Sequence, residues 1–338
     1  MKKSTLMALL CAAAVTPAVA QDLPASASTD IYDQSPWENE QMVKLFAKAA
    51  DEGRNFPTKE EFEAVGLTFD LEFVRSHTRL RPIYKDAAAD VVADINHDRR
   101  LWCNLPGGYG KNTGGYPSAT FDQDVFSMWN YTHLFGSWNY SIFTAPGAWI
   151  DAAHRNGTRI YSGIKFFEYW NNDGSEAAYA DFVSTKDDKG NYKYAPAMVN
   201  MAAFFGNDGI NYNSEGTSHT DADWIGFHAA TKQNAVERGF TNFGIGQYTQ
   251  DANNLSSSNI ESHYGSASKG EIYDCMLNYS GNMLAYRSIA TTIASVEAQG
   301  LSMDNVYQGQ LLVGLSGDYW TQMNTDNGKK LNICIWGE

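Results

Sequence analysis

The sequence is poor in cysteine and in basic residues. Three of its four cysteines lie beyond residue 20, at Cys103, Cys275 and Cys334. This odd number, without CxxC spacing, argues against a disulfide framework and a zinc site. Lysine and arginine number 25 against 39 aspartates and glutamates, which gives a formal net charge of -14. An acidic chain of this kind is not expected to bind nucleic acid or an anionic membrane.

Long apolar runs and nucleotide motifs are missing as well. After the N-terminal segment no run approaches the roughly 20 apolar residues of a membrane-spanning helix, so no membrane insertion is expected. Neither a P-loop nor a GxGxxG opens any predicted helix, which argues against a phosphate site. We therefore predict no metal and no cofactor.

The first 20 residues have the pattern of a secretory signal peptide. Lys2 and Lys3 precede an apolar run over 6–15, and an A-x-A cleavage site ends at Ala20. Cys11 raises a lipoprotein alternative, but the preceding leucine is larger than the small residue a lipobox needs. Removing this segment leaves a net charge of about -16. We expect a soluble monomer in the periplasm or outside the cell.

The remaining chain has the size and composition of one large domain. With 338 residues and 43% hydrophobic content it can bury a single barrel-sized core. It contains 9 Trp, 19 Tyr and 17 Phe. Flat aromatic faces commonly line sugar sites, although most of these side chains must fill the core.

Residues 21–97 form a lead and helices before this domain. An apolar stripe predicts a helix over 38–52. Thr58 and Glu61 offer a capping box for a second helix, which Gly66 would close. We expect this segment to pack against the barrel.

From residue 98 to 338 extended segments alternate with amphipathic helices. The predicted strands cover 101–105, 131–138, 159–167, 209–215, 242–248, 272–279, 306–315 and 331–336. The predicted helices cover 146–155, 196–205, 222–238 and 283–299, and each ends near a glycine: Gly157, Gly206, Gly239 and Gly300. Eight strands alternating with helices predict an α/β fold, a (β/α)8 TIM barrel. A helix after the eighth strand would be absent, supplied by the N-terminal helices or encoded beyond this sequence.

The fourth predicted strand carries polar residues where a buried strand needs apolar ones. Asn211, Asn213 and Glu215 alternate and so point to one side. Carboxamides and carboxylates are costly to bury without partners. An acid beside a carboxamide suits chemistry on an acetamido sugar, with the acid protonating the leaving oxygen. A solvated turn is the alternative for an isolated Asn-x-Glu.

The same end of other strands is polar and aromatic. Active sites of such barrels lie at the carboxyl ends of the strands, where these residues would converge. They are Trp138, Glu168, Tyr248, Asn278, Tyr279 and Trp336. Glu168 is either a second site carboxylate or a solvated strand end. The concave, aromatic pocket that results fits a sugar.

Several other polar residues have structural interpretations. His133 and His154 lack a second histidine at ligand spacing and are expected to be hydrogen-bonded within the fold. His219, Asp221 and Asp223 open the helix after the fourth strand, where we predict capping and not metal binding. The acidic run over 181–188 is predicted to be an exposed loop.

Residues 129–138, Trp-Asn-Tyr-Thr-His-Leu-Phe-Gly-Ser-Trp, and 151–157, Asp-Ala-Ala-His-Arg-Asn-Gly, together resemble the second strand and helix of glycoside hydrolase family 85. Residues 205–209 and 213–215 resemble that family's lead-in and Asn-x-Glu pair. The likeness spans about 100–338, with His133 and Trp138 departing from the pattern as in a divergent branch. Family 85 enzymes are endo-β-N-acetylglucosaminidases that cleave the chitobiose core of N-glycans.

The resemblance implies roles for three residues. Glu215 would act as general acid and then base, and Asn213 would orient the substrate acetamide, whose oxygen attacks the anomeric carbon. Tyr248 would support that group. The expected outcome is hydrolysis of an N-glycan or glycoprotein with retention, through an oxazoline intermediate.

Two other functions stay open. Glycoside hydrolase family 18 has an Asp-Gly-x-x-Asp-x-Asp-x-Glu strand end whose spacing is matched over 208–215, but Asn211 and Asn213 replace its inner aspartates. A chitinase-like enzyme would follow from that likeness. A non-catalytic barrel that captures glycans is the third interpretation, and the presence of Glu215 weighs against it.

Overall fold

A computed structural model describes residues 36–67, 75–81, 99–104, 126–136, 147–163, 175–214, 216, 218–249, 252–277, 289–311, 321, 323, 325 and 328–336. Among these residues, no helix is both long and apolar enough to cross a membrane. The signal-peptide segment and residues 283–288 of the helix predicted over 283–299 lie outside the described residues.

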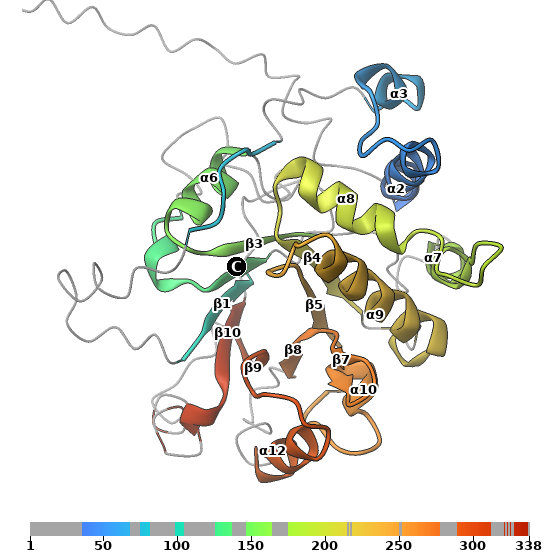
Figure 1. The fold of residues 1–338 in the computed structure, drawn as a ribbon. Coiled ribbons are helices and arrows are strands. Elements are labelled where there is room, and N and C mark those ends of the chain that lie inside the picture. The colour runs from blue at the N-terminus through green and yellow to red at the C-terminus, as the bar shows by residue number, and fades with distance from the viewer. Residues whose placement is uncertain are drawn as a thin grey trace, which may run out of the picture.

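Eight parallel strands close into a barrel, as the sequence predicts (Figure 1). In chain order they are β1 (Leu101–Asn104), β2 (Leu134–Gly136), β3 (Arg159–Gly163), β4 (Gly209–Asn213), β5 (Gly244–Tyr248), β8 (Asp274–Leu277), β9 (Val306–Leu311) and β10 (Asn332–Trp336). β10 pairs with β1 from Leu101 opposite Ile333 to Asn104 opposite Trp336, which completes the circle. The fold is a (β/α)8 barrel.

Helices surround this barrel (Figure 1). They are α6 (Gly147–Arg155), α7 (Ser175–Ser184), α8 (Ala195–Phe205), α9 (Ala222–Glu237), α10 (Ile260–His263) and α12 (Ile289–Ala298), preceded in the chain by α2 (Pro36–Asp51) and α3 (Lys59–Ala64). Each of four predicted helix ends is followed by a glycine in the left-handed region: Gly157, Gly206, Gly239 and Gly300, with φ from 68° to 87°. The glycine signal in the sequence was therefore correct.

The capping box predicted for the second N-terminal helix is present. Thr58 Oγ1 accepts the Glu61 amide at 3.3 Å, and the Glu61 carboxylate accepts the Thr58 amide at 2.9 Å. α2 packs on α8, with Phe46 against Phe204 and Phe205 at ring-centroid distances of 5.4 and 6.3 Å. α2 thus does not take the place of a closing helix between β10 and β1 (Figure 1).

Each strand separates two apolar layers, because its side chains alternate. Inside the barrel lie residues such as Trp102, Leu134, Tyr161, Met276 and Tyr307. Outside, each strand packs on its helices in three further clusters, and the largest joins α2, α8 and α9 to β4 and β5. This alternation fixes which residues reach the barrel interior.

Three sequence predictions were wrong in detail. The run over 181–188 is not all loop, since α7 extends to Ser184 and buries Phe182 and Val183. The second strand is three residues long, because the 3-10 helix η1 (Trp129–Tyr131) occupies the start of its predicted range. Between β5 and β8 the chain adds α10 and a hairpin of β6 (Gly265–Ser266) and β7 (Gly270–Glu271).

Candidate active site

Two asparagines from opposite parts of the barrel meet at the carboxyl ends of its strands. Asn211 of β4 is 4% exposed and donates from Nδ2 to Asn104 Oδ1 of β1 at 3.2 Å. Asn104 lies two residues after Trp102 on β1, and the Trp102 side chain lies inside the barrel. Toward its carboxyl end the barrel interior therefore contains the neutral amides of Asn104 and Asn211 and the indole ring of Trp102.

A glycine creates the space for Asn211. A Cβ atom on Gly246 of β5 would stand 2.5 Å from Asn211 Oδ1 and 2.9 Å from the Trp102 ring. Contacts this short do not occur for real Cβ atoms, so any larger residue would displace the amide. Asn104 and Trp102 were missed as site residues, although Asn104 ends the first predicted strand and the rule used for the other strand ends would have found it.

The strand register sets Asn213 beside Tyr248. Asn213 ends β4, and its Cα partner on β5 is Tyr248, the last residue of that strand. The next residue, Ser214, donates its amide to the Tyr248 carbonyl at 2.8 Å. Tyr248 is 8% exposed and belongs to the cluster inside the barrel. The backbones of Asn213 and Tyr248 are thus neighbours at the carboxyl end of the barrel.

The remaining predicted site residues differ in what the structure describes. Trp336 ends β10, is half-buried and has Asn104 as its Cα partner. For Asn213 only the backbone is described. Five predicted residues lie outside the described residues, namely Trp138, Glu168, Glu215, Asn278 and Tyr279. Asn211, Tyr248 and Trp336 are therefore the predicted side chains that the structure places at this end.

The segment after β4 is fixed by two buried histidines. The 3-10 helix η3 (Ser218–Thr220) carries His219, 2% exposed, whose ring lies 5.1 Å from the ring of His263 on α10.

The predicted capping of α9 is only partly correct. Asp221 occupies the N-cap position without a side-chain bond, and Asp223 instead binds Lys186 Nζ at 3.1 Å and the Tyr192 hydroxyl at 3.0 Å.

The amino end of the barrel holds a separate charged cluster. Arg159 donates to the Tyr161 hydroxyl at 2.7 Å and to Asp274 Oδ1 at 3.1 Å, and Tyr161 donates to Asp274 Oδ2 at 2.6 Å. Burial raises the pKa of Tyr161 well above its usual value of 10, so the phenol stays neutral and remains a donor. A Cβ on Gly244 would overlap the Tyr161 hydroxyl. This cluster fills the barrel and leaves no room for a substrate.

His154 and Asp208 form a second buried pair at the amino end. His154 Nε2 lies 2.8 Å from Asp208 Oδ2, and Nδ1 lies against the Thr78 carbonyl. Both neighbours are acceptors, so the ring fits them best with a proton on each nitrogen. Burial alone would lower the pKa of His154, but the Asp208 carboxylate and the Thr78 carbonyl raise it above its usual value. His154 is structural, as the sequence predicts, and so is His133, whose Nδ1 accepts the Leu101 amide at 3.1 Å.

The described residues include no cluster of three or more His, Cys, Asp or Glu side chains arranged to hold a metal ion. The three cysteines of that part of the chain are buried and unpaired. Burial raises the pKa of Cys103 to about 11, which keeps its thiol protonated. None of the three has the environment of a reactive thiol.

Comparison with known proteins gives a family and a fold. The sequence profile of glycosyl hydrolase family 85 matches residues 109–269, just under half of the chain. No curated protein matches by sequence. The glycoside hydrolase domain of Endo-D from Streptococcus pneumoniae superposes with a TM-score of 0.58 at 19% identity, over 79% of this chain and 43% of that one. The chain thus spans less than half the length of that structure, and at this identity the likeness concerns the fold.

Two further solved structures share less of the geometry. A family 18 chitinase from Pseudoalteromonas aurantia has a TM-score of 0.46 at 12% identity, over 71% of this chain and 94% of that one. An endo-β-N-acetylglucosaminidase from Cordyceps militaris has a TM-score of 0.41 at 11% identity, over 75% and 86%. The family profile covers β4 and β5 with the Asn213–Tyr248 pair between them, on a closed barrel of eight parallel strands. Residues 109–269 thus match the profile of glycosyl hydrolase family 85, and they lie within a (β/α)8 barrel.

Proposed function

We propose that the chain is an endo-β-N-acetylglucosaminidase that hydrolyses the bond between the two N-acetylglucosamine residues of an N-glycan core. The observation that carries this proposal is the pairing of Asn213 with Tyr248 at the carboxyl ends of β4 and β5, two residues before Glu215. Neighbouring strand ends that carry an asparagine and a tyrosine suit an acetamido group. Glu215, two residues after Asn213 in the sequence, would supply the acid for the glycosidic oxygen.

The proposed reaction proceeds in two steps. Glu215 donates its proton to the glycosidic oxygen as the acetamide oxygen of the substrate attacks C1, so the C1–O bond breaks and an oxazoline forms. Asn213 orients the acetamide and Tyr248 supports it. Glu215, now a carboxylate, takes a proton from water, and the water oxygen attacks C1 and opens the oxazoline with retained configuration.

Two features favour a nucleophile supplied by the substrate. Among the described residues that end the barrel strands on the inside, such as Asn104, Gly136, Asn211, Tyr248 and Met276, none is a carboxylate. Retaining enzymes that use a protein nucleophile need a second carboxyl group about 5–5.5 Å from the first. The neutral amides instead match the uncharged, polar acetamide and hydroxyl groups of a sugar.

The test uses a mixture of high-mannose and complex N-glycoproteins, analysed by gel shift and mass spectrometry. Wild type should leave one N-acetylglucosamine on asparagine, and the cleaved glycoform identifies the substrate class. Glu215→Gln should lower the rate about 10²–10⁴-fold, because it removes the general acid. Asn213→Ala should lower it about 10²–10³-fold, in line with the loss of a positioned hydrogen-bond donor.

Glu237→Gln on α9 is the matched control, since Glu237 is exposed on the surface and its exchange should leave turnover unchanged. Intact glycoproteins after incubation with wild type would contradict the N-glycan assignment. Shortening of chito-oligosaccharides would then favour the chitinase-like alternative, and binding of either ligand without turnover would favour a glycan-capturing barrel.

We also propose export to the periplasm or the extracellular space, on the basis of residues 1–20. Mass spectrometry of protein expressed with its leader should find a mature chain beginning at Gln21. Protein recovered with Met1 intact would contradict this proposal, and a lipid-modified Cys11 would favour the lipoprotein alternative.

A further inference from the structure

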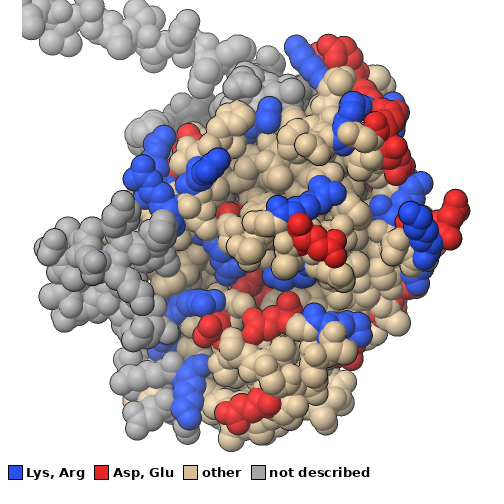
Figure 2. All heavy atoms as spheres, viewed as in Figure 1, with Lys and Arg blue, Asp and Glu red and all other residues tan. Residues whose placement is uncertain are grey.

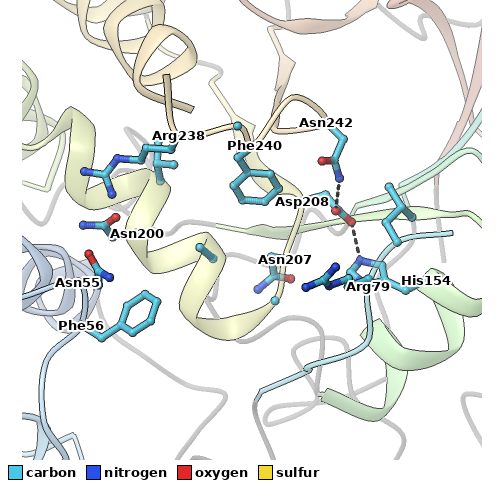
Figure 3. Close-up of a pocket in the computed structure, with 15 residues that line it drawn as sticks. Asn55, Phe56, Arg79, His154, Asn200, Asn207, Asp208, Arg238, Phe240 and Asn242 are labelled. Carbon is cyan, nitrogen blue, oxygen red and sulfur yellow. Dashed lines mark hydrogen bonds and ion pairs between the residues drawn. The ribbon is translucent and has the colours of Figure 1, made fainter. Parts of the chain in front are cut away.

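A cavity of about 780 Å³ opens at the amino end of the barrel, away from the strand ends that carry the candidate active site (Figure 3). Its floor is built by residues that directly precede β4 and β5, among them Asn207, Asp208 and Asn242. Its walls come from the turn before α3, the segment 75–81 and the end of α9. Volumes of roughly 300–1,000 Å³ are typical of ligand pockets.

Two arginines line this cavity on different sides. In Figure 3 Arg79 lies beside Asn207, and Arg238 lies on the other side with its guanidinium near Asn200. Both are exposed, and neither forms an ion pair with any residue in the described part of the chain. Acidic and basic side chains are intermixed on the face seen in Figure 2. Other basic residues do pair with acidic ones, as Lys48 does with Glu61 and Lys186 with Asp223. An unpaired arginine couple is unexpected in a chain with net charge -14.

The one acidic residue that lines the cavity does not offset these arginines. Asp208 Oδ1 accepts from Asn242 Nδ2 at 2.6 Å, and Oδ2 accepts from the Ile160 amide at 2.9 Å and meets His154 Nε2 at 2.8 Å. The positive charge of His154 offsets the negative charge of the Asp208 carboxylate. The described lining therefore carries a net positive charge from Arg79 and Arg238.

The remaining lining is polar amide and aromatic carbon. Asn207 is 3% exposed, and its Oδ1 has no hydrogen-bond donor in the described part of the chain. Buried carboxamide oxygens are normally paired, so this one indicates an absent water or ligand donor. Phe56, 38% exposed, and Phe240 present ring surface to the same space. The amides can bind hydroxyl groups, the rings can pack on the faces of a pyranose, and the arginines can bind an anion. Together these groups suit an acidic sugar.

We propose that this cavity is a second, non-catalytic site that binds a saccharide bearing a negative charge. Arg79 or Arg238 binds the anionic group, and Asn207 and the neighbouring amides bind hydroxyl groups. The inference depends on the lining residues alone and does not depend on the proposed hydrolysis at the opposite end. Its ligand carries either a carboxylate or a phosphate, which the experiment distinguishes.

Binding of N-acetylneuraminic acid, glucose 6-phosphate and neutral N-acetylglucosamine to the full chain is measured by calorimetry. An acidic sugar should bind more tightly than the neutral one, and the tighter of the two acids identifies the anionic group. The Arg79→Ala/Arg238→Ala variant should lose about tenfold or more of that affinity, because the charge-assisted bond to the anionic group is lost. Affinity should also fall with added salt.

Lys330→Ala/Lys269→Ala removes two positive charges from other surfaces and is the matched control. It should leave acidic-sugar binding unchanged, whereas Asn207→Asp should weaken it by adding a negative charge to the floor. Equal binding by wild type and by the arginine variant would overturn the proposal. So would inorganic phosphate binding as tightly as glucose 6-phosphate, since an anion site alone would then explain the result. Glycosidase assays on the same samples report separately on the proposed function.

Discussion

The two ends of this barrel hold polar residues of different kinds. At the amino end, Arg159, Tyr161 and Asp274 satisfy one another, and His154 does the same with Asp208. At the carboxyl end the described interior residues are neutral amides and aromatic rings, with glycines between them. Within the described barrel interior, the paired charges thus lie at the amino end.

The difference reflects what each end has to do. Burying a charge is tolerated only when partners replace the lost water, so a fully paired cluster stabilises one conformation and has nothing left to offer a ligand. Neutral amides cost less to leave partly unpaired. The Trp102 indole nitrogen, the Ser214 hydroxyl and the Thr249 hydroxyl, all at or near the carboxyl end, have no hydrogen-bond partner in the described part of the chain. A substrate can use such groups.

Removing one member of the charged cluster should have the largest effect on stability. Asp274 is 4% and Arg159 is 19% exposed at the side chain. Asp274→Ala leaves Arg159 and the Tyr161 hydroxyl without their acceptor, and should lower the free energy of unfolding by about 3–5 kcal/mol. Urea denaturation followed by circular dichroism measures this change.

Glu261→Ala is the matched control, because Glu261 pairs with Lys269 at the surface, where the side chains are 46% and 36% exposed. That substitution should cost less than about 1 kcal/mol. Equal losses of unfolding free energy for the two variants would show that the cluster at the amino end stabilises the fold no more than a surface ion pair does.

At the carboxyl end the corresponding substitution should affect turnover more than stability. Asn211→Ala removes the hydrogen bond to Asn104 and the support beneath Asn213, so kcat should fall about 100-fold through misplacement of the reacting groups. The free energy of unfolding should fall by only about 1–2 kcal/mol, the usual cost of one neutral hydrogen bond and a small cavity. Steady-state kinetics and urea denaturation on the same samples separate the two effects.

The control for Asn211 is Asn234→Ala on α9, where the side chain bonds only to the Ala230 carbonyl of its own helix. It should leave kcat unchanged. In the opposite outcome, Asn211→Ala unfolds the protein and keeps full activity per folded molecule. That result would contradict the view that the carboxyl end serves turnover more than stability.

The sequence predicted the barrel because the relevant signals are local. Alternating apolar strands, amphipathic helices and the glycine after each helix depend on residues near one another in the chain, and β4 was located by its own polar alternation. The family resemblance implied that Asn213 and Tyr248 act on the same group, and the observed register makes them Cα partners.

Partners distant in sequence were not predictable in the same way. The bond from Asn211 to Asn104 spans 107 positions and depends on Gly246 leaving space on a third strand. The cluster of Arg159 with Asp274 spans 115 positions. Single residues carry no mark of such contacts, because barrel closure alone brings them together. α7 was missed because the acidic run over 181–188 predicted an exposed loop, although Phe182 and Val183 are buried.

The smallest expected effect concerns pH and the pair of His154 with Asp208. The pKa of His154 is raised above 6.5 in the folded chain, so its contribution to stability is complete below that pH and is lost as pH rises through the folded pKa. His154→Gln should therefore destabilise the protein by about 1–2 kcal/mol below pH 6.5 and by less in alkaline solution. Urea denaturation of both proteins across this range measures the difference. A constant difference at every pH would mean that His154 is neutral in the fold and that the amino end lacks its second charge pair. A difference that shrinks with rising pH would establish that pair, and with it the neutralisation of Asp208 at the amino end of the barrel.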